Sequence, residues 1–305
     1  MKRVNVNFES TTDTTGYLVS LANCLSASLR CGVYEEYADD IIATSGFAFR
    51  MWVDAGLCPS ATSIWEFKKQ KQWVESGGLT CDYVERMWGE DNIKEERRIH
   101  GIEIIKKSVD SGIAAVVWDI SGGEWGLVTG YDDETRTLYT LKIFGNESEV
   151  PYEKLGQLDL PILSVLTVTG KTNKTKADII ADTQKLALSH LRGEEWCDNA
   201  KGISAYDTLI DFIEEKLTVD TVWNLEYYLG TYAALKWYAW KFFEKYGKTE
   251  LADIYKSVYI SWQSAFDYKK KNEDIILDKP ARNSIGDFLR GAKASEEKAM
   301  VLLEA

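Results

Sequence analysis

The side chains in this sequence that are best suited to chemistry are its few histidines and cysteines. Among 305 residues there are only two histidines, His100 and His190, and five cysteines, at positions 24, 31, 58, 81 and 197. No two of them stand at CxxC or HxxxH spacing, so we expect no locally assembled metal site. The GxxxxGK[ST] and GxGxxG patterns that bind phosphate are missing, as is GxSxG. We therefore expect the chain to work without a metal or cofactor.

Both histidines have sequence contexts that favour structural roles. His100 lies among charged neighbours in RRIHGIEII, which is typical of a solvated or capping residue on a helix. His190 lies near the predicted end of a helix, where a histidine interacts favourably with the helix dipole. A Ser-His-Asp hydrolase would have to use one of these two.

Cys24 is the cysteine with the strongest case for reactivity. It lies in a helix-forming segment, 15–31, that precedes the predicted strands. A thiol at a helix N-terminus has a lowered pKa and can act as a nucleophile. However, Cys24 also lies between Leu21, Leu25 and Leu29, a setting typical of a buried small apolar residue. Both interpretations stay open from the sequence.

Glu124 lies in the least generic stretch of the chain, 122–133. Two glycines lead into a predicted strand whose first side chains are Glu124 and Trp125. A carboxylate at that position would stand at the end of the sheet, where catalytic bases often lie. The alternative is a glycine-rich turn with a solvated glutamate.

These residues must be positioned by a fold that we predict to be α+β. Apolar periodicity and turn residues predict helices in the first half at 15–31, 34–54 and 93–111, and strands at 113–120, 125–131, 137–144 and 162–169. Residues 132–135 read as a hairpin turn, 57–91 as loops with short elements, and 170–176 as a linker. Beyond the linker we expect helices at 177–193, 204–217, 219–246, 249–271 and 284–304. The predicted domains are therefore 1–170 and 171–305.

Composition limits the classes of partner. The chain carries a net charge of −12, of which −10 falls within residues 1–170, so binding to nucleic acid is not expected. No window approaches 18 uncharged apolar residues, so we expect no membrane span. The opening MKRVNVNFES lacks the apolar core of a signal peptide, and the odd cysteine count suits a reducing compartment, so we expect a cytoplasmic protein.

Aromatic residues are concentrated in 223–268. Tyr255, Tyr259, Trp262 and Phe266 recur at helical spacing, which is typical of core packing. The alternatives are an aromatic-lined cavity and a subunit contact, so a homodimer or a scaffolding role is a further expectation. The run 269–271, three lysines, is expected to be a solvated helix end.

Three stretches together resemble a known family. They are TSGFAFR at 44–50, GEWGLVTGYDDE at 123–134 and GISAYDTLI at 202–210. With the order of elements, they are similar to the papain-like fold of bacteriocin-processing (double-glycine) peptidases, and closer still to the butirosin biosynthesis protein H type. The resemblance implies a papain-like domain, an N-terminal helix plus antiparallel sheet, followed by an all-helical domain. It also implies a ligand site at Ser45, Arg50, Glu124 and Trp125.

The resemblance implies a degenerate active site as well. The family's catalytic histidine opens the strand where this chain has Glu124, and its supporting aspartate falls where this chain has Lys142-Ile143. The family's nucleophilic cysteine stands farther from the end of the first helix than Cys24 does, near Val19 or Ser20. An anionic glutamate beside a thiol would raise the pKa of that thiol, which opposes activation.

Two functions from different classes follow. The first is a catalytically degenerate papain-like protein that binds a small organic or peptide-like ligand in the former active-site cleft, with Glu124 as its polar anchor, in a biosynthetic pathway. The alternative is a thiol-dependent acyltransferase or amidohydrolase that uses Cys24 as nucleophile and Glu124 as base.

Overall fold

The computed structural model describes residues 1–63, 67–194 and 197–304, and these form two compact units. The first unit comprises 1–12, 20–45 and 65–179, and the second comprises 13–19, 46–64 and 180–305. The predicted division at 170/171 falls close to the last of these changes. Two short N-terminal segments nevertheless belong with the C-terminal helices, because their backbone and side chains bond to those helices.

The first unit is built on an antiparallel sheet, in agreement with the α+β prediction. Its strands run in the order β3-β8-β4-β5-β6-β7, and β1 pairs with β5 beyond β4. The strands are β1 (Lys2–Arg3), β3 (Leu79–Arg86), β4 (Ala115–Val117), β5 (Gly126–Asp132), β6 (Thr137–Lys142), β7 (Glu147–Pro151) and β8 (Leu163–Lys171). The sequence pattern missed β1, β3 and β7.

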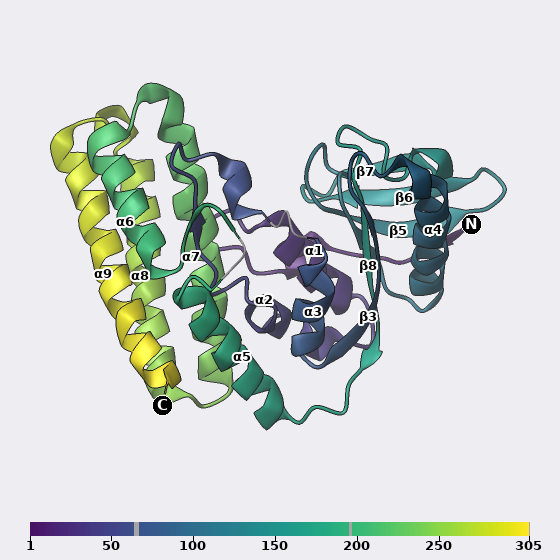
Figure 1. Ribbon diagram of the computed structural model, residues 1–305, viewed down its shortest axis with the longest axis horizontal. Helices are drawn as coiled ribbons and strands as arrows, with labels where there is room; N and C mark the ends of the chain where they lie inside the picture. Colours follow the sequence, from purple (N-terminus) through teal and green to yellow (C-terminus); the bar gives the residue numbers. More distant parts are fainter. Residues whose placement is uncertain (64–66, 195–196, 305) are drawn as a thin grey trace. The chain divides into compact units, whose positions relative to one another are not determined.

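Helix α4 (Lys94–Asp110) covers one face of this sheet. Three of its four isoleucines, at 102, 104 and 105, are buried against strand residues that include Val117 and Val165, whereas Ile99 is exposed. Helices α1 (Ser20–Arg30) and α3 (Lys69–Ser76) lie on the other side of β3 and β8 from α4 (Figure 1), and α1 packs on β4 and β5. The strands β4 and β5 are therefore covered by helices on both faces, which explains why β4 is apolar throughout.

The segment 34–54 is not the broken helix that its composition suggested. It contains a 3₁₀ turn (Glu35–Tyr37), a one-turn helix α2 (Asp40–Thr44) and the short strand β2 (Trp52–Val53). Strand β2 pairs with β9 (Ala200–Lys201) in the second unit, and Tyr232 bonds to both backbone groups of Trp52. This pairing with distant residues overrides the local helical preference.

The second unit is a helical assembly. It contains most of α5 (Lys176–Leu191), then α6 (Ile203–Asp211), which continues as a π-helical turn (Phe212–Lys216), α7 (Val222–Lys245), α8 (Thr249–Lys271) and α9 (Lys279–Glu304) (Figure 1). Most of the aromatic residues at 223–268 are buried inside it, Tyr255 and Trp262 completely, whereas Trp223 is exposed. The aromatic stripe is thus mainly core. In the described residues no helix combines the length and apolar character needed to cross a membrane.

Candidate functional site

Ser20 and Glu124 meet in the first unit. Ser20 is the first residue of α1, which begins five residues later than the segment predicted from the sequence. Its Oγ donates a hydrogen bond of 2.5 Å to Oε2 of Glu124, and the backbone N–H of Trp125 approaches the same Oγ at 3.4 Å. A hydroxyl group at a helix N-terminus is therefore held against a carboxylate that lies 104 residues away in the chain.

The loop before β5 fixes the position of Glu124. Gly122 and Gly123 both have positive φ, and the carbonyl of Glu124 accepts the N–H of Ser121 at 3.3 Å. Asp119 anchors the loop: its Oδ1 accepts the N–H of Gly123 at 2.6 Å, and its Oδ2 accepts that of Leu160 at 2.7 Å. Asp119 is buried and has a φ of 66°, a conformation that costs energy for any residue other than glycine.

The Glu124 carboxyl group is only partly accessible to solvent, and this determines its electrostatics. Burial raises the pKa of Glu124, and the hydrogen bond from Ser20 opposes that rise without cancelling it. Among the residues that the structure describes, no lysine, arginine or histidine forms an ion pair with Glu124. Within the described residues its charge therefore has no cationic partner.

Cys24 lies one helical turn after Ser20 and is completely buried. Burial and the nearby charge of Glu124 together raise the pKa of the Cys24 thiol well above its usual value. A thiolate is the nucleophilic form of cysteine, so this environment opposes reactivity. Neither histidine is among the groups that shift the pKa of Cys24: His100 is exposed on α4, and His190 is buried near the end of α5.

Trp125 supports the site from within the core rather than from its surface. Its ring is fully buried and packs on Phe67 and Trp118, with ring centroids 5.3 and 5.2 Å away. The indole Nε1–H of Trp125 has no hydrogen-bond partner within the described part of the chain. What Trp125 gives the site is its backbone N–H.

Ser45 and Arg50, the other two predicted ligand residues, are both buried and belong to different units. The Ser45 hydroxyl donates to the carbonyl of Ile41. The Arg50 guanidinium lies over the rings of Phe47 and Trp52, 4.3 and 4.2 Å from their centroids. Each side chain is thus occupied by packing or bonding inside its own unit.

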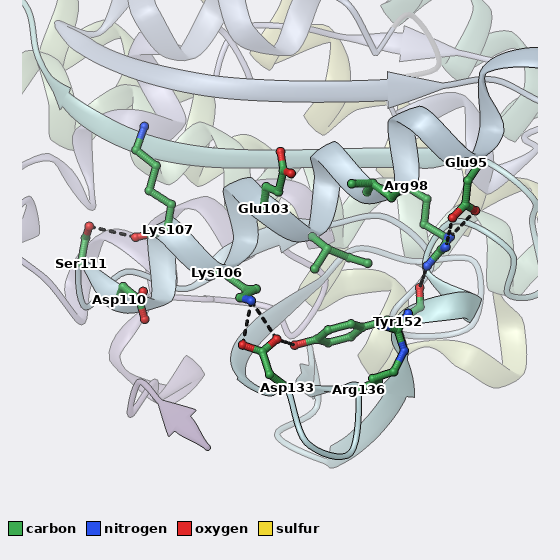
Figure 2. Close-up of a pocket in the computed structure, with 12 residues that line it drawn as sticks. Glu95, Arg98, Glu103, Lys106, Lys107, Asp110, Ser111, Asp133, Arg136 and Tyr152 are labelled. Atoms are coloured by element: carbon green, nitrogen blue, oxygen red, sulfur yellow. Dashed lines mark hydrogen bonds and ion pairs between the residues drawn. The ribbon is translucent and has the colours of Figure 1, made fainter.

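A separate groove of about 720 Å³ lies along α4 in the first unit. Figure 2 shows Lys106, Asp133, Arg136 and Tyr152 along it, with Glu95 and Arg98 at one end. Most of its charges are already paired, as in the Lys106–Asp133 contact of 2.7 Å and the Arg98–Glu95 contact. No sequence pattern indicated this groove.

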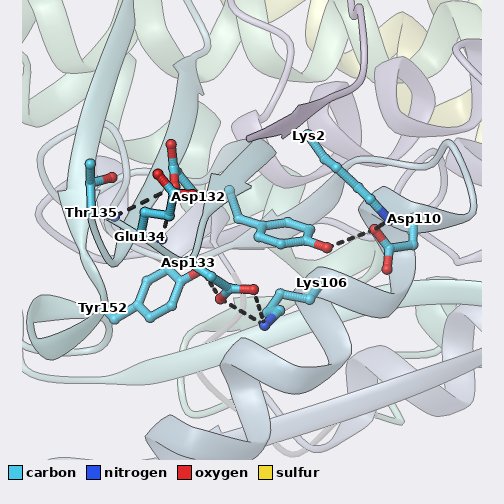
Figure 3. A network of polar contacts seen from close by, with 9 residues as sticks. Lys2, Lys106, Asp110, Asp132, Asp133, Glu134, Thr135 and Tyr152 are labelled. Atoms are coloured by element: carbon cyan, nitrogen blue, oxygen red, sulfur yellow. Dashed lines mark hydrogen bonds and ion pairs between the residues drawn. The ribbon is translucent and has the colours of Figure 1, made fainter.

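The polar network beside the groove ties three elements together (Figure 3). Asp110 of α4 accepts bonds from Lys2 of β1 and from Tyr131 of β5, at 2.6 and 2.8 Å. In the predicted hairpin turn, Oδ1 of Asp132 accepts the N–H of Glu134 at 2.9 Å. These contacts hold β1 on α4, and the Lys106–Asp133 pair holds the turn on the same helix.

Sequence reasoning missed two residues of the Ser20–Glu124 site. Ser20 was named only as a position near which the family's cysteine would fall, whereas the structure has it as a hydroxyl donor at a helix start. Asp119 follows an apolar run and carries no motif, so only the loop geometry identifies it. The one usable signal was that serine is common at helix starts.

No group of three or more potential metal ligands occurs among residues 1–63, 67–194 and 197–304. The chain matches no protein-family model, and no curated protein matches it significantly.

Proposed function

We propose that the chain binds a small organic or peptide-like ligand at the pair formed by Ser20 and Glu124, and that it does so without thiol chemistry. In the terms of the papain-like resemblance, it is a degenerate relative in which a carboxylate takes the place of the imidazole. The ligand that suits this pair carries an amine or another N–H donor.

The observation that carries the proposal is the uncompensated Glu124 carboxylate. An ionised group that is half-buried and unpaired is costly, because burial disfavours the charged form. A ligand ammonium group would compensate that charge and form charge-assisted hydrogen bonds, which are about twice as strong as neutral ones. Ser20 would then act as a second polar contact beside it.

The alternative function, acyl transfer through the Cys24 thiol, has less support. A nucleophilic cysteine needs access and a stabilised thiolate. Cys24 is fully buried, and both its burial and Glu124 raise its pKa. We therefore favour binding over thiol catalysis.

Thermal-shift measurements with a library of amines, amino-acid amides and short peptides test the proposed function. We expect a subset of amine-bearing compounds to raise the Tm of the wild-type protein in a saturable manner. The same compounds should have a weaker effect on Glu124→Gln, which keeps the size of the side chain but removes its charge.

The matched control is Glu149→Gln on β7, which removes an exposed carboxylate from the same sheet. It should respond to the compounds as the wild type does. A library without effect on the wild type, or equal shifts in wild type and Glu124→Gln, would contradict the proposal.

A further inference from the structure

We propose that a groove beside helix α3 binds the phosphate groups of a small phosphorylated molecule. The groove belongs to the first unit, and its described lining shares no residue with the Ser20–Glu124 pair. Its charge is also opposite, positive where the pair is negative. The two sites are therefore independent of each other, and either proposal can fail without the other.

The groove has a volume of about 680 Å³, within the range of roughly 300–1,000 Å³ that is usual for small-molecule sites. One wall is α3, which packs on β3 (Figure 1). Lys68, Lys71 and Glu75 line the groove from this helix, because spacings of three and four residues place them on one face. Thr172 and Lys174 line it from the segment after β8, within the stretch that was predicted to be a linker.

The groove reverses the charge of the chain around it. Residues 1–170 carry a net charge of −10. Among the described lining residues, by contrast, three lysine ammonium groups accompany one carboxylate, that of Glu75. Three like charges repel one another, and an anion bound among them relieves that repulsion.

Carboxylates outside the groove compensate these lysines only weakly. Glu85 lies 3.8 Å from the Nζ of Lys68, and Asp178 interacts with Lys174. Both lysines are exposed, so water and salt screen these contacts. The groove therefore keeps most of its positive charge for a ligand.

Two of the ammonium groups are already held in place by backbone carbonyl groups. Nζ of Lys71 donates to the carbonyl of Cys81 at 2.6 Å, and Nζ of Lys174 donates to that of Ser76 at 3.2 Å. A carbonyl positions an ammonium group without neutralising it, and an ammonium group has three protons to donate. Less side-chain freedom is then lost when an anion binds, which favours binding.

The kinds of side chain in the groove suit phosphate better than carboxylate. Carboxylates are matched best by the planar guanidinium group of arginine, whereas lysine binds phosphate as a point charge. The lining residues that the structure describes include three lysines and no arginine. Thr172 adds a hydroxyl whose oxygen accepts the N–H of Lys174 at 3.3 Å, so its own proton can be donated to a phosphate oxygen.

Calorimetric titration of the whole protein with inorganic pyrophosphate tests the proposal. At an ionic strength of about 0.15 M, where distant charges are screened, we expect saturable binding of one pyrophosphate per chain. Citrate, which carries its charge on carboxylates, should bind roughly tenfold more weakly, because lysine does not match the planar carboxylate as arginine does.

Substitution of the lysines locates the binding site. Lys71→Gln and Lys174→Gln should each weaken pyrophosphate binding roughly tenfold, since each removes a charge-assisted hydrogen bond. The matched control is Lys154→Gln, which changes the charge of the first unit by the same amount at an exposed lysine outside this lining. It should bind pyrophosphate as the wild type does.

Glu75→Gln separates the effect of charge from an effect on folding. It removes the lining carboxylate and should strengthen pyrophosphate binding by roughly three- to tenfold, because repulsion of the anion is lost. Damage to the fold would weaken binding instead. The matched control, Glu149→Gln, removes an exposed carboxylate on β7 and should leave the affinity unchanged.

Four outcomes would overturn the inference. They are a wild type without saturable pyrophosphate binding, lysine variants that bind as the wild type does, a Glu75→Gln variant that binds no more tightly than Glu149→Gln, and citrate binding as tight as that of pyrophosphate. None of these results depends on whether amine ligands bind at Glu124.

Discussion

Lys236 of α7 and Glu296 of α9 form an ion pair of 2.7 Å in which both side chains are completely shielded from solvent. The second carboxylate oxygen of Glu296 accepts the Tyr206 hydroxyl at 2.8 Å, and that hydroxyl accepts Trp262 Nε1–H at 2.8 Å. The polar groups of three helices are thus joined to α9 inside the helical unit. A satisfied buried network of this kind makes one packing arrangement preferable to others.

Replacing Lys236 by methionine should destabilise the protein by about 3–5 kcal/mol, because it leaves the Glu296 charge buried without its partner. Urea denaturation measures the change. The double variant Lys236→Met/Glu296→Leu should recover much of the loss, since it removes both charges. The matched control is Lys293→Met, which breaks the more exposed pair with Asp207 and should cost less than about 1 kcal/mol. Equal losses in the two single variants would contradict this account.

Glu226 should make the protein sensitive to acid. Burial acts to raise the pKa of Glu226, but hydrogen bonds from Lys269, Tyr17 and Lys270 outweigh it and lower the pKa to about 2. A lowered pKa in the folded state stabilises the protein above the unfolded value of about 4.3, and this contribution is lost as the pH falls toward 2.

Stability measured between pH 5 and pH 2 should therefore fall by roughly 3 kcal/mol more in the wild type than in Glu226→Gln, which lacks the titrating group. The control is Glu273→Gln, which changes an exposed carboxylate that pairs with Lys269 and Lys270. It should retain most of the wild-type pH dependence. A Glu226→Gln variant with an unchanged pH dependence would show that Glu226 does not titrate as its contacts imply.

The cysteines should differ sharply in reactivity. Cys58 is exposed, whereas Cys24 is buried with a raised pKa. At neutral pH iodoacetamide should therefore modify Cys58 first, and Cys24 only after denaturation; peptide mass spectrometry distinguishes them. Cys58→Ser should remove the fast phase of labelling without exposing Cys24. Selective labelling of Cys24 in the native protein would revive the thiol-enzyme alternative.

Asp119 should control the Ser20–Glu124 site from a distance. Asp119→Ala removes both backbone bonds of the loop and should cost about 1–3 kcal/mol in urea denaturation, with weaker binding of amine ligands. Asp132→Asn is the control, because the Oδ1 of that turn residue can still accept its backbone N–H groups. If Asp119→Ala leaves both stability and ligand binding unchanged, the loop does not depend on this anchor.

The sequence predicted elements well where one face is regularly apolar. Helix α4 was expected at 93–111 and runs from 94 to 110, because its isoleucines follow the helical period. Strand β7, Glu147–Pro151, was missed because it is a sheet edge with only Val150 buried, so it carries little hydrophobic pattern. The α+β class could be predicted from the sequence. The assignment of residues 13–19 and 46–64 to the helical unit could not, because it depends on long-range contacts.

Polar pairs that form over long sequence separations were the hardest to predict. Lys269 was expected to be solvated with its two lysine neighbours, which is wrong: it is buried and bonds to Glu226. Glu124 was singled out from its glycine-rich context, yet its partner Ser20 could not be identified. In both cases the decisive group lies far away in the chain, where local periodicity carries no information.

The alternation of the chain between its two units also affects how the protein is made. Residues 46–64 emerge from the ribosome more than a hundred residues before the helices beyond 180 that they join. At typical synthesis rates this is a delay of roughly 6–25 s. Throughout that interval Phe49 and Trp52, both buried in the finished protein, have none of their helical partners. We expect the nascent chain to need a chaperone at this segment until the last helices are translated.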